Sequence, residues 1–180
     1  MVGELPRWGG SRRRADWRST KTRGAEVESR MVAVLDELGL TELVTSIAGI
    51  RAVGAAAMLA QTGDPTRFDC ARTLVKNAGL CPRDNTSGTY EGRSRISRRG
   101  RPGLRLAAWR ATWGALHHNP VMAARYRYLT TRQHNRLTDR QARAAIAAAL
   151  LRWLHVVVTR RVRWDAAIAG AGVDALAAAA

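Results

Sequence analysis

The segment from Glu91 to Arg105 carries a dense set of cationic side chains. Its six arginines stand among glycines and serines and face one acidic residue, Glu91: Arg93, Arg95, Arg98, Arg99, Arg101 and Arg105. Guanidinium groups bind phosphate oxygens through paired hydrogen bonds. Six like charges in so short a segment repel one another unless a polyanion lies close by. The segment therefore predicts contact with nucleic acid, and a solvated run of charge is the ordinary alternative.

A hydroxyl group just before this segment could take part in phosphodiester chemistry. Ser87 lies between Thr86 and Gly88, and Arg83 precedes it. Nearby arginines would favour an ionised serine oxygen and balance the charge on a pentavalent phosphorus. A Ser-Gly pair is also ordinary turn chemistry, and no base stands beside it in the sequence. Two further serines in the same region compete for the role: Ser94 and Ser97.

A glycine-containing turn between two short apolar stretches is a second candidate for phosphate contact. Over Ile47–Gly54, two short helices joined by this turn could aim backbone N–H groups and a helix N-terminus at a phosphate. The usual helix-hairpin-helix form has a second glycine two residues after the first, and here Arg51 takes that position after Gly49. Gly49 and Arg51 are therefore candidate contacts, with a plain helical hairpin as the alternative.

Four aromatic residues in the second half are spaced as on two helices. Trp109 and Trp113 lie four apart, and Tyr126 and Tyr128 follow on the next helix. Such side chains could stack on unpaired bases. Their helical spacing favours packing in the core instead.

The acidic residues are too scattered for a two-metal centre, which needs three or four convergent carboxylates. The second half has four acidic residues in different predicted elements: Glu91, Asp139, Asp165 and Asp174. Two cysteines, Cys70 and Cys81, make neither a zinc quartet nor a disulfide framework. We expect no metal site and no cofactor in this chain.

Composition supports an anionic partner. The 180 residues include 30 basic and 14 acidic side chains, for a net charge of +16, and all but two of the basic ones are arginine. Residues 1–90 hold 13 basic and ten acidic side chains, whereas residues 91–180 hold 17 and four. A GC-rich genome also enriches arginine, but the one-sided charge favours a partner made of phosphates.

Nothing in the sequence predicts a membrane segment. The N-terminus has no apolar signal core. The longest apolar run, over 144–158, is interrupted by Arg152 and is shorter than the roughly 20 residues that span a bilayer. The chain is 46% hydrophobic, which suffices for a core. We expect a soluble cytoplasmic protein in a reducing compartment.

The first half of the chain predicts short helices. Residues 1–24 show no period and are expected to form a disordered basic arm. Apolar spacing predicts a helix over 25–38 and a helix-hairpin-helix over 40–62. Asp64 and Pro65 suit the N-cap and first position of a helix over 66–78.

The second half predicts one irregular segment followed by a helical bundle. The Gly- and Pro-rich segment 79–103 is expected to be a long basic loop or a small β-hairpin. Within the bundle, over 104–160, we expect helices at 104–117, at 120–134 behind an Asn119-Pro120 cap, and at 139–159 behind Thr138. A short helix after Asp165 and an Ala-rich tail, 171–180, complete a mostly α chain with its domain at 25–170.

The run from Ser46 to Arg105 resembles the C-terminal transposase domain of the insertion-sequence one-ten family, also known by its one-sixteen and nine-oh-two members. The likeness continues through LHHNPVMAARY, NRLTDRQARAAIAAALLRWLH and RRVRWDAAIAG. It spans about Val27 to Gly170. Several motifs in the right order make it specific.

The resemblance implies a DNA transposase or recombinase that moves an insertion sequence. In that family a serine of this domain attacks DNA, and Ser87 stands at the matching position, with the basic ISRRG segment after it. The family also implies a helix-hairpin-helix fold and assembly as an oligomer. In some members a structured noncoding RNA guides targeting.

One departure from the family changes the expected activity. Members carry an N-terminal RuvC-like domain whose four acidic residues bind divalent metal, usually Mg²⁺, and here the arm of residues 1–24 stands in its place. We therefore expect a truncated transposase that binds DNA or RNA and is inactive without a full-length partner. A non-catalytic helix-hairpin-helix module that binds DNA or RNA structure, and a basic RNA-binding protein unrelated to transposition, are the alternatives.

Overall fold

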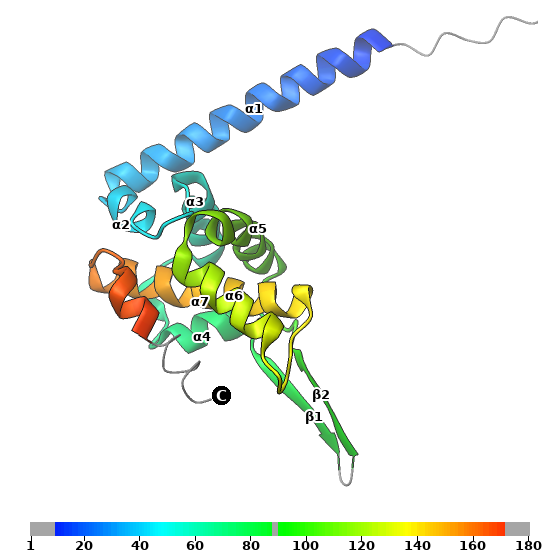
Figure 1. Ribbon diagram of the computed structural model, residues 1–180. Coiled ribbons are helices and arrows are strands. Elements are labelled where there is room, and N and C mark those ends of the chain that lie inside the picture. Colours follow the sequence, from blue (N-terminus) through cyan, green and yellow to red (C-terminus); the bar gives the residue numbers. More distant parts are fainter. Residues whose placement is uncertain (1–9, 88–89, 172–180) are drawn as a thin grey trace, which may run out of the picture.

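The computed structural model describes the backbone of residues 10–87 and 90–171, and the side chains of residues 19–83 and 95–171. The fold is mostly helical with one antiparallel β-hairpin, as the sequence predicts (Figure 1). In chain order the elements are α1 (Gly10–Glu37), α2 (Thr41–Thr45), α3 (Ala52–Thr62), a 3₁₀ turn η1 (Pro65–Arg67), α4 (Ala71–Asn77), β1 (Pro82–Ser87), β2 (Tyr90–Ile96), α5 (Pro102–His118), α6 (Pro120–Thr131) and α7 (Asp139–Arg160).

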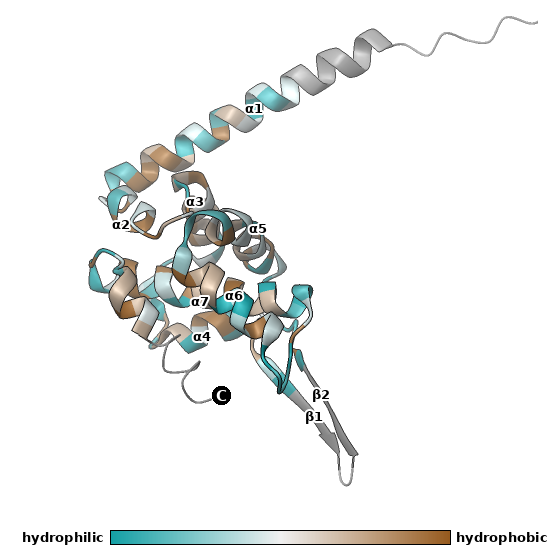
Figure 2. Cartoon of the chain, viewed as in Figure 1, coloured by the Kyte–Doolittle hydropathy of each residue, from teal (hydrophilic) through white to brown (hydrophobic). Residues whose placement is uncertain are grey.

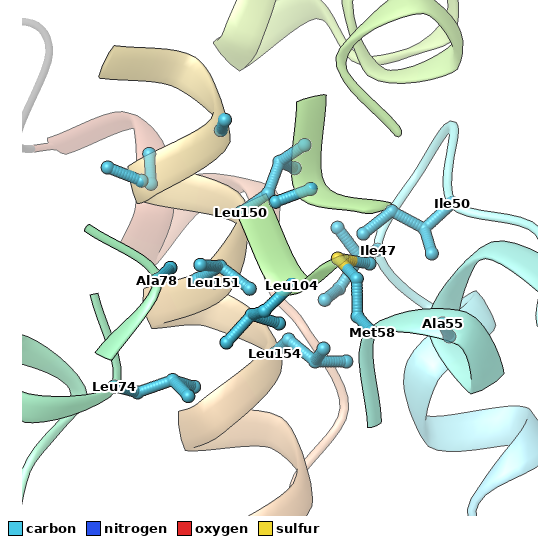
Figure 3. Close-up of a cluster of buried hydrophobic side chains, with 14 of the residues drawn as sticks. Ile47, Ile50, Ala55, Met58, Leu74, Ala78, Leu104, Leu150, Leu151 and Leu154 are labelled. Atoms are coloured by element: carbon cyan, nitrogen blue, oxygen red, sulfur yellow. The ribbon is translucent and has the colours of Figure 1, made fainter. Parts of the chain in front are cut away.

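Helix α7 is the centre of the core. Helices α2, α4, α5 and α6 all contact it. Leu150, Leu151 and Leu154 of α7 are fully buried and meet Leu104 of α5 and Met58 of α3 (Figure 3). Burying a leucine side chain stabilises a fold by about 1.5–3 kcal/mol. Apolar residues gather on these packed helices (Figure 2).

The length and hydropathy of α7 would allow it to cross a membrane. However, 67% of its most apolar 18-residue window is buried inside the molecule. The other helices already cover that surface, so α7 has the environment of a core helix in a globular domain.

The turn between α2 and α3 is docked on the corner between α5 and α6. Gly49 has a φ of +84° and lies against Gly114 of α5. A Cβ on either glycine would lie 2.4 Å from the carbonyl oxygen of the other. The buried Asn119 side chain donates to the Ala48 carbonyl at 3.2 Å. Two helical segments distant in sequence are thus joined backbone to backbone.

Local capping confirms several predicted helix starts. The Asp64 carboxylate accepts the Thr66 N–H at 2.8 Å, at the start of η1. The Asn119 side chain accepts the Met122 N–H at 3.2 Å, at the start of α6. At α7 the Gln141 side chain reaches back to accept the Thr138 N–H at 2.9 Å. These bonds satisfy backbone donors that have no partner inside the helix.

The expectation of a disordered arm over residues 1–24 is wrong for residues 10–24, which form the first half of α1. Residues 1–9 lie outside the described residues. The segment has no apolar period, but five of its 15 residues are arginine, which favours helix once a neighbouring turn is formed. The helix therefore extends from the apolar C-terminal half of α1 through residues 10–24.

Two other helices are shorter than expected. The helix over 66–78 is interrupted because Phe68 is buried and its carbonyl lies 3.1 Å from the His155 ring Nε2. Only η1 and α4 remain helical there. Helix α6 ends at Thr131, since the Leu137 N–H bonds the Leu129 carbonyl at 2.9 Å and turns the chain back.

Gly114→Ala should lower the free energy of unfolding by about 1–3 kcal/mol, because the added methyl meets the Gly49 carbonyl. Gly54→Ala in α3 is the matched control, since a Cβ there has nothing within 4 Å. It should raise stability by up to about 1 kcal/mol through helix propensity. Urea midpoints measure both. Equal stabilisation by both variants would contradict the docked turn.

Candidate nucleic-acid interface

The segment predicted as a loop or small hairpin is a two-stranded antiparallel hairpin that projects from the helical body between α4 and α5 (Figure 1). Its strands pair from Pro82 opposite Ile96 to Ser87 opposite Tyr90. The register shifts between Arg83 and Asn85, which marks a bulge. The strands therefore hold Arg83, Arg93 and Arg95 on extended backbone. The remaining arginines of the basic segment follow β2, and Arg105 lies in α5.

Two arginines face each other across the hairpin. Arg83 pairs with Arg95 in the ladder, and both are exposed. Like charges directly opposite on neighbouring strands destabilise a sheet. An anion bound between them would remove that repulsion.

The root of the hairpin is locked by close backbone contacts. Gly79 has a φ of +69°, and a Cβ on Gly100 would lie 2.1 Å from the Asn77 carbonyl oxygen. Only glycine fits so close an approach. Three backbone hydrogen bonds complete the root: Ser97 N–H to Cys81 O at 2.8 Å, Arg98 N–H to Gly79 O at 2.9 Å and Arg101 N–H to Asn77 O at 2.7 Å.

Two of the predicted nucleic-acid contacts have intramolecular partners at this root. The Arg101 guanidinium donates to the Gln61 carbonyl at 2.8 Å, at the end of α3. The Arg105 guanidinium donates to the Ala78 carbonyl at 3.0 Å, at the end of α4. Cations at helix C-termini bind unsatisfied carbonyls and the negative end of the helix dipole. Both arginines therefore position the hairpin, whatever else they contact.

Arg98 and Arg99 present their side chains at the same root. Both are exposed, and within the described part of the chain neither guanidinium has a hydrogen-bond or ion-pair partner. Arg98 has a φ of +53°, a conformation that non-glycine residues rarely adopt. The root hydrogen bonds hold it there. The strained turn thus displays two guanidiniums beside the strands.

Gly49 and Arg51 lie apart from the hairpin. Arg51 is the exposed N-cap of α3, while the hairpin root contacts Gln61 at the other end of that helix. Ten residues of helix separate these points by about 15 Å. Gly49 is required by the close contact with α5, so its conformation has a structural cause. Its role as a phosphate contact stays a prediction.

Ser87 is the last residue of β1, at the tip of the hairpin. It stands four residues beyond Arg83, about 13 Å along an extended strand. The side chains of Ser87, Ser94 and Arg93 lie outside the described residues. Ser97 sits at the root instead. The structure therefore separates the candidate serines by position but leaves the choice of nucleophile a prediction.

The described residues do not fit a magnesium centre of the kind the family resemblance implies. No three metal-ligating side chains group among them. Asp139 already accepts hydrogen bonds from the Tyr126 hydroxyl and the Arg143 guanidinium, which hold the pKa of its carboxyl below the usual value. Asp165 caps the backbone at Ala167. A metal-binding centre would have to come from other residues.

Sequence reasoning placed Trp113 in the core, and for this residue it is wrong. Trp113 is 60% exposed on α5, whereas Trp109 is packed against the core as expected. The reasoning also missed the exposed arginines around the α6–α7 connection, such as Arg127 and Arg140. Helical spacing alone does not say which of two neighbouring faces the other helices cover.

The fold and its site define a basic helical domain that carries an arginine-bearing hairpin. Residues 41–127, from α2 into α6, match the family model described as Transposase IS116/IS110/IS902 family. Over these residues the chain is therefore similar to that transposase family. This match confirms the resemblance to the insertion-sequence one-ten family.

A protein of Streptomyces coelicolor, the insertion element IS110 uncharacterized 43.6 kDa protein, is 29% identical over 100 residues. The match covers 56% of this chain and 25% of that relative. The chain thus corresponds to about a quarter of the relative's length.

Arg101→Ala and Arg105→Ala should each lower the free energy of unfolding by about 1 kcal/mol, because each leaves a helix-terminal carbonyl without its charged donor. Arg99→Ala is the matched control and should change stability by less than about 0.5 kcal/mol. Thermal or urea unfolding measures all three. If Arg99→Ala is destabilised while Arg101→Ala and Arg105→Ala are not, Arg101 and Arg105 do not hold the hairpin root.

Proposed function

We propose that this chain binds DNA through the sugar–phosphate backbone as part of an insertion-sequence transposase. The observation that carries the proposal is the hairpin, where Arg83 faces Arg95 and the root displays Arg98 and Arg99. No carboxylate within the described residues forms an ion pair with Arg98 or Arg99. Polyanion binding would release counterions and relieve the repulsion. The transposase family of residues 41–127 supports DNA as the polyanion.

A second point of contact is proposed at the start of α3. The N–H groups of its first turn have no side-chain cap, and Arg51 stands exposed beside them. A helix N-terminus of this kind favours a phosphate. Together with the hairpin it would contact one duplex at two places about 15 Å apart, as judged from the length of α3.

For catalysis we propose Ser87 as the nucleophile. Its oxygen would form a bond to phosphorus while one bridging P–O bond of the DNA breaks. The serine proton ends on the released sugar hydroxyl, so the step needs no oxidant or external energy source. The family match and the position of Ser87 at the end of β1 support this assignment.

We further propose that the chain acts with a second copy or a full-length transposase, in the cytoplasm. Helix α1 leaves Val27 and Val34 exposed, and Leu38 directly after the helix is exposed as well, which supports association with another chain. Any Mg²⁺ would then be bound by residues of the partner. A structured guide RNA offers the same phosphates and is included in the proposal.

Duplex DNA should be retained at low ionic strength and released as salt rises. The double variant Arg98→Ala, Arg99→Ala should reduce the slope of log affinity against log salt by about 2, since each lost phosphate contact removes about 0.9. Arg160→Ala, an exposed arginine at the end of α7, is the control and should leave the slope unchanged. Filter binding across a salt series measures it. If wild-type protein retains no polynucleotide at low salt, the proposed function fails.

Ser87→Ala should abolish a covalent protein–DNA adduct formed in the presence of a full-length family transposase. Ser94→Ala and Ser97→Ala are the matched controls and should retain the adduct. Denaturing electrophoresis with labelled DNA detects the species. If wild type and Ser87→Ala are equally inert while both bind DNA, the chain is a non-catalytic binding module.

A further inference from the structure

An exposed tryptophan lies on the helical body at a place that the proposed backbone contacts do not use. Trp113 of α5 is 60% exposed, although its neighbours on the same helix pack inward. The Arg143 guanidinium of α7 lies 4.0 Å from the centre of its ring, so one face of the indole is covered. The exposed surface must therefore be the opposite face and the edge.

The ring is held in place by a connected set of side chains. The Arg143 Nε donates to the Asp139 carboxylate at 2.9 Å, and the Tyr126 hydroxyl donates to the same carboxylate. Arg143 also lies 5.7 Å from the Tyr126 ring centre. Its side chain is only 16% exposed, so its stacking position is fixed by packing as well as by charge. A rigid aromatic surface loses little entropy when it binds a flat partner.

The charge around this ring is positive. Arg110 is exposed one turn before Trp113 on α5, and Arg140 is exposed one turn before Arg143 on α7. Side chains three residues apart on a helix are neighbours. The nearby carboxylate of Asp139 is already bound by Arg143 and Tyr126. An exposed aromatic ring between cations matches an unpaired base with its flanking phosphates.

We propose that Trp113 is a stacking platform for an unpaired nucleobase, with Arg143 bracing the ring from behind. The proposal rests on the proposed nucleic-acid binding and adds a base contact to its phosphate contacts. Arg110 and Arg140 then bind the phosphates on either side of the stacked base. Single strands, frayed ends and loops of structured nucleic acid present such bases, and intact duplex does not.

The test compares an oligothymidine strand with an abasic strand of the same length, which has the same phosphates and no bases. Wild type should bind the thymidine strand roughly tenfold more tightly, since stacking on an aromatic side chain contributes on this scale. Trp113→Ala should lose that preference and keep its affinity for the abasic strand. Trp113→Phe should retain part of it. Leu106→Ala, at a 48% exposed apolar residue two turns earlier on α5, is the matched control.

The outcomes separate this inference from the proposed function. If wild type binds both strands equally, or Trp113→Ala keeps the preference, the platform is wrong while backbone binding stands. If Trp113→Ala weakens both strands equally, or instead alters self-association in sedimentation, the surface serves another contact and the platform is again wrong. If wild type binds neither strand nor duplex at low salt, the proposed function fails as well. Urea unfolding checks that the exposed substitution leaves the fold intact.

Discussion

The burial of α7 is the constraint on which the rest of the structure depends. This helix is apolar on most of its surface, so it is stable in water only when other helices surround it. Helices α2, α4, α5 and α6 do so, and Leu104 and Met58 fill the space between them and the leucines of α7. Because these helices already cover α7, the segment between α4 and α5 has no apolar surface left to pack against. It leaves the body as a hairpin.

That arrangement explains why the arginines of this segment lie together on the surface of the protein. Both helices that flank the hairpin pack on α7, and Arg101 and Arg105 fasten its root to the ends of α3 and α4. The guanidiniums of Arg101 and Arg105 thus hold the hairpin root in place, while Arg98 and Arg99 stay exposed. Arg83 and Arg95 stand opposite each other in the strand ladder, so the hairpin also carries positive charge beyond its root.

The candidate contacts are spread over the surface, and the helices set their separation. Arg51 lies at one end of α3 and the hairpin root at the other. Trp113 belongs to a different surface, braced by Arg143 from α7. Phosphate contacts at two places with a base contact at a third would favour a nucleic acid that combines helical and unpaired segments. Residues 41–127, which carry all of these positions except Arg143, match the family model of IS116/IS110/IS902 transposases.

The sequence by itself determined the mostly helical class, the capped starts at Asp64 and Asn119, and the concentration of positive charge, because these features depend on neighbours along the chain. Tertiary structure alone decided which arginines anchor the hairpin, that Trp113 faces outward, and that Gly49 meets Gly114. It also decided that the helix before α4 is broken at Phe68, where His155 from α7 approaches. These outcomes arise from contacts between residues distant in sequence, and local spacing carries no information about which face a distant helix covers.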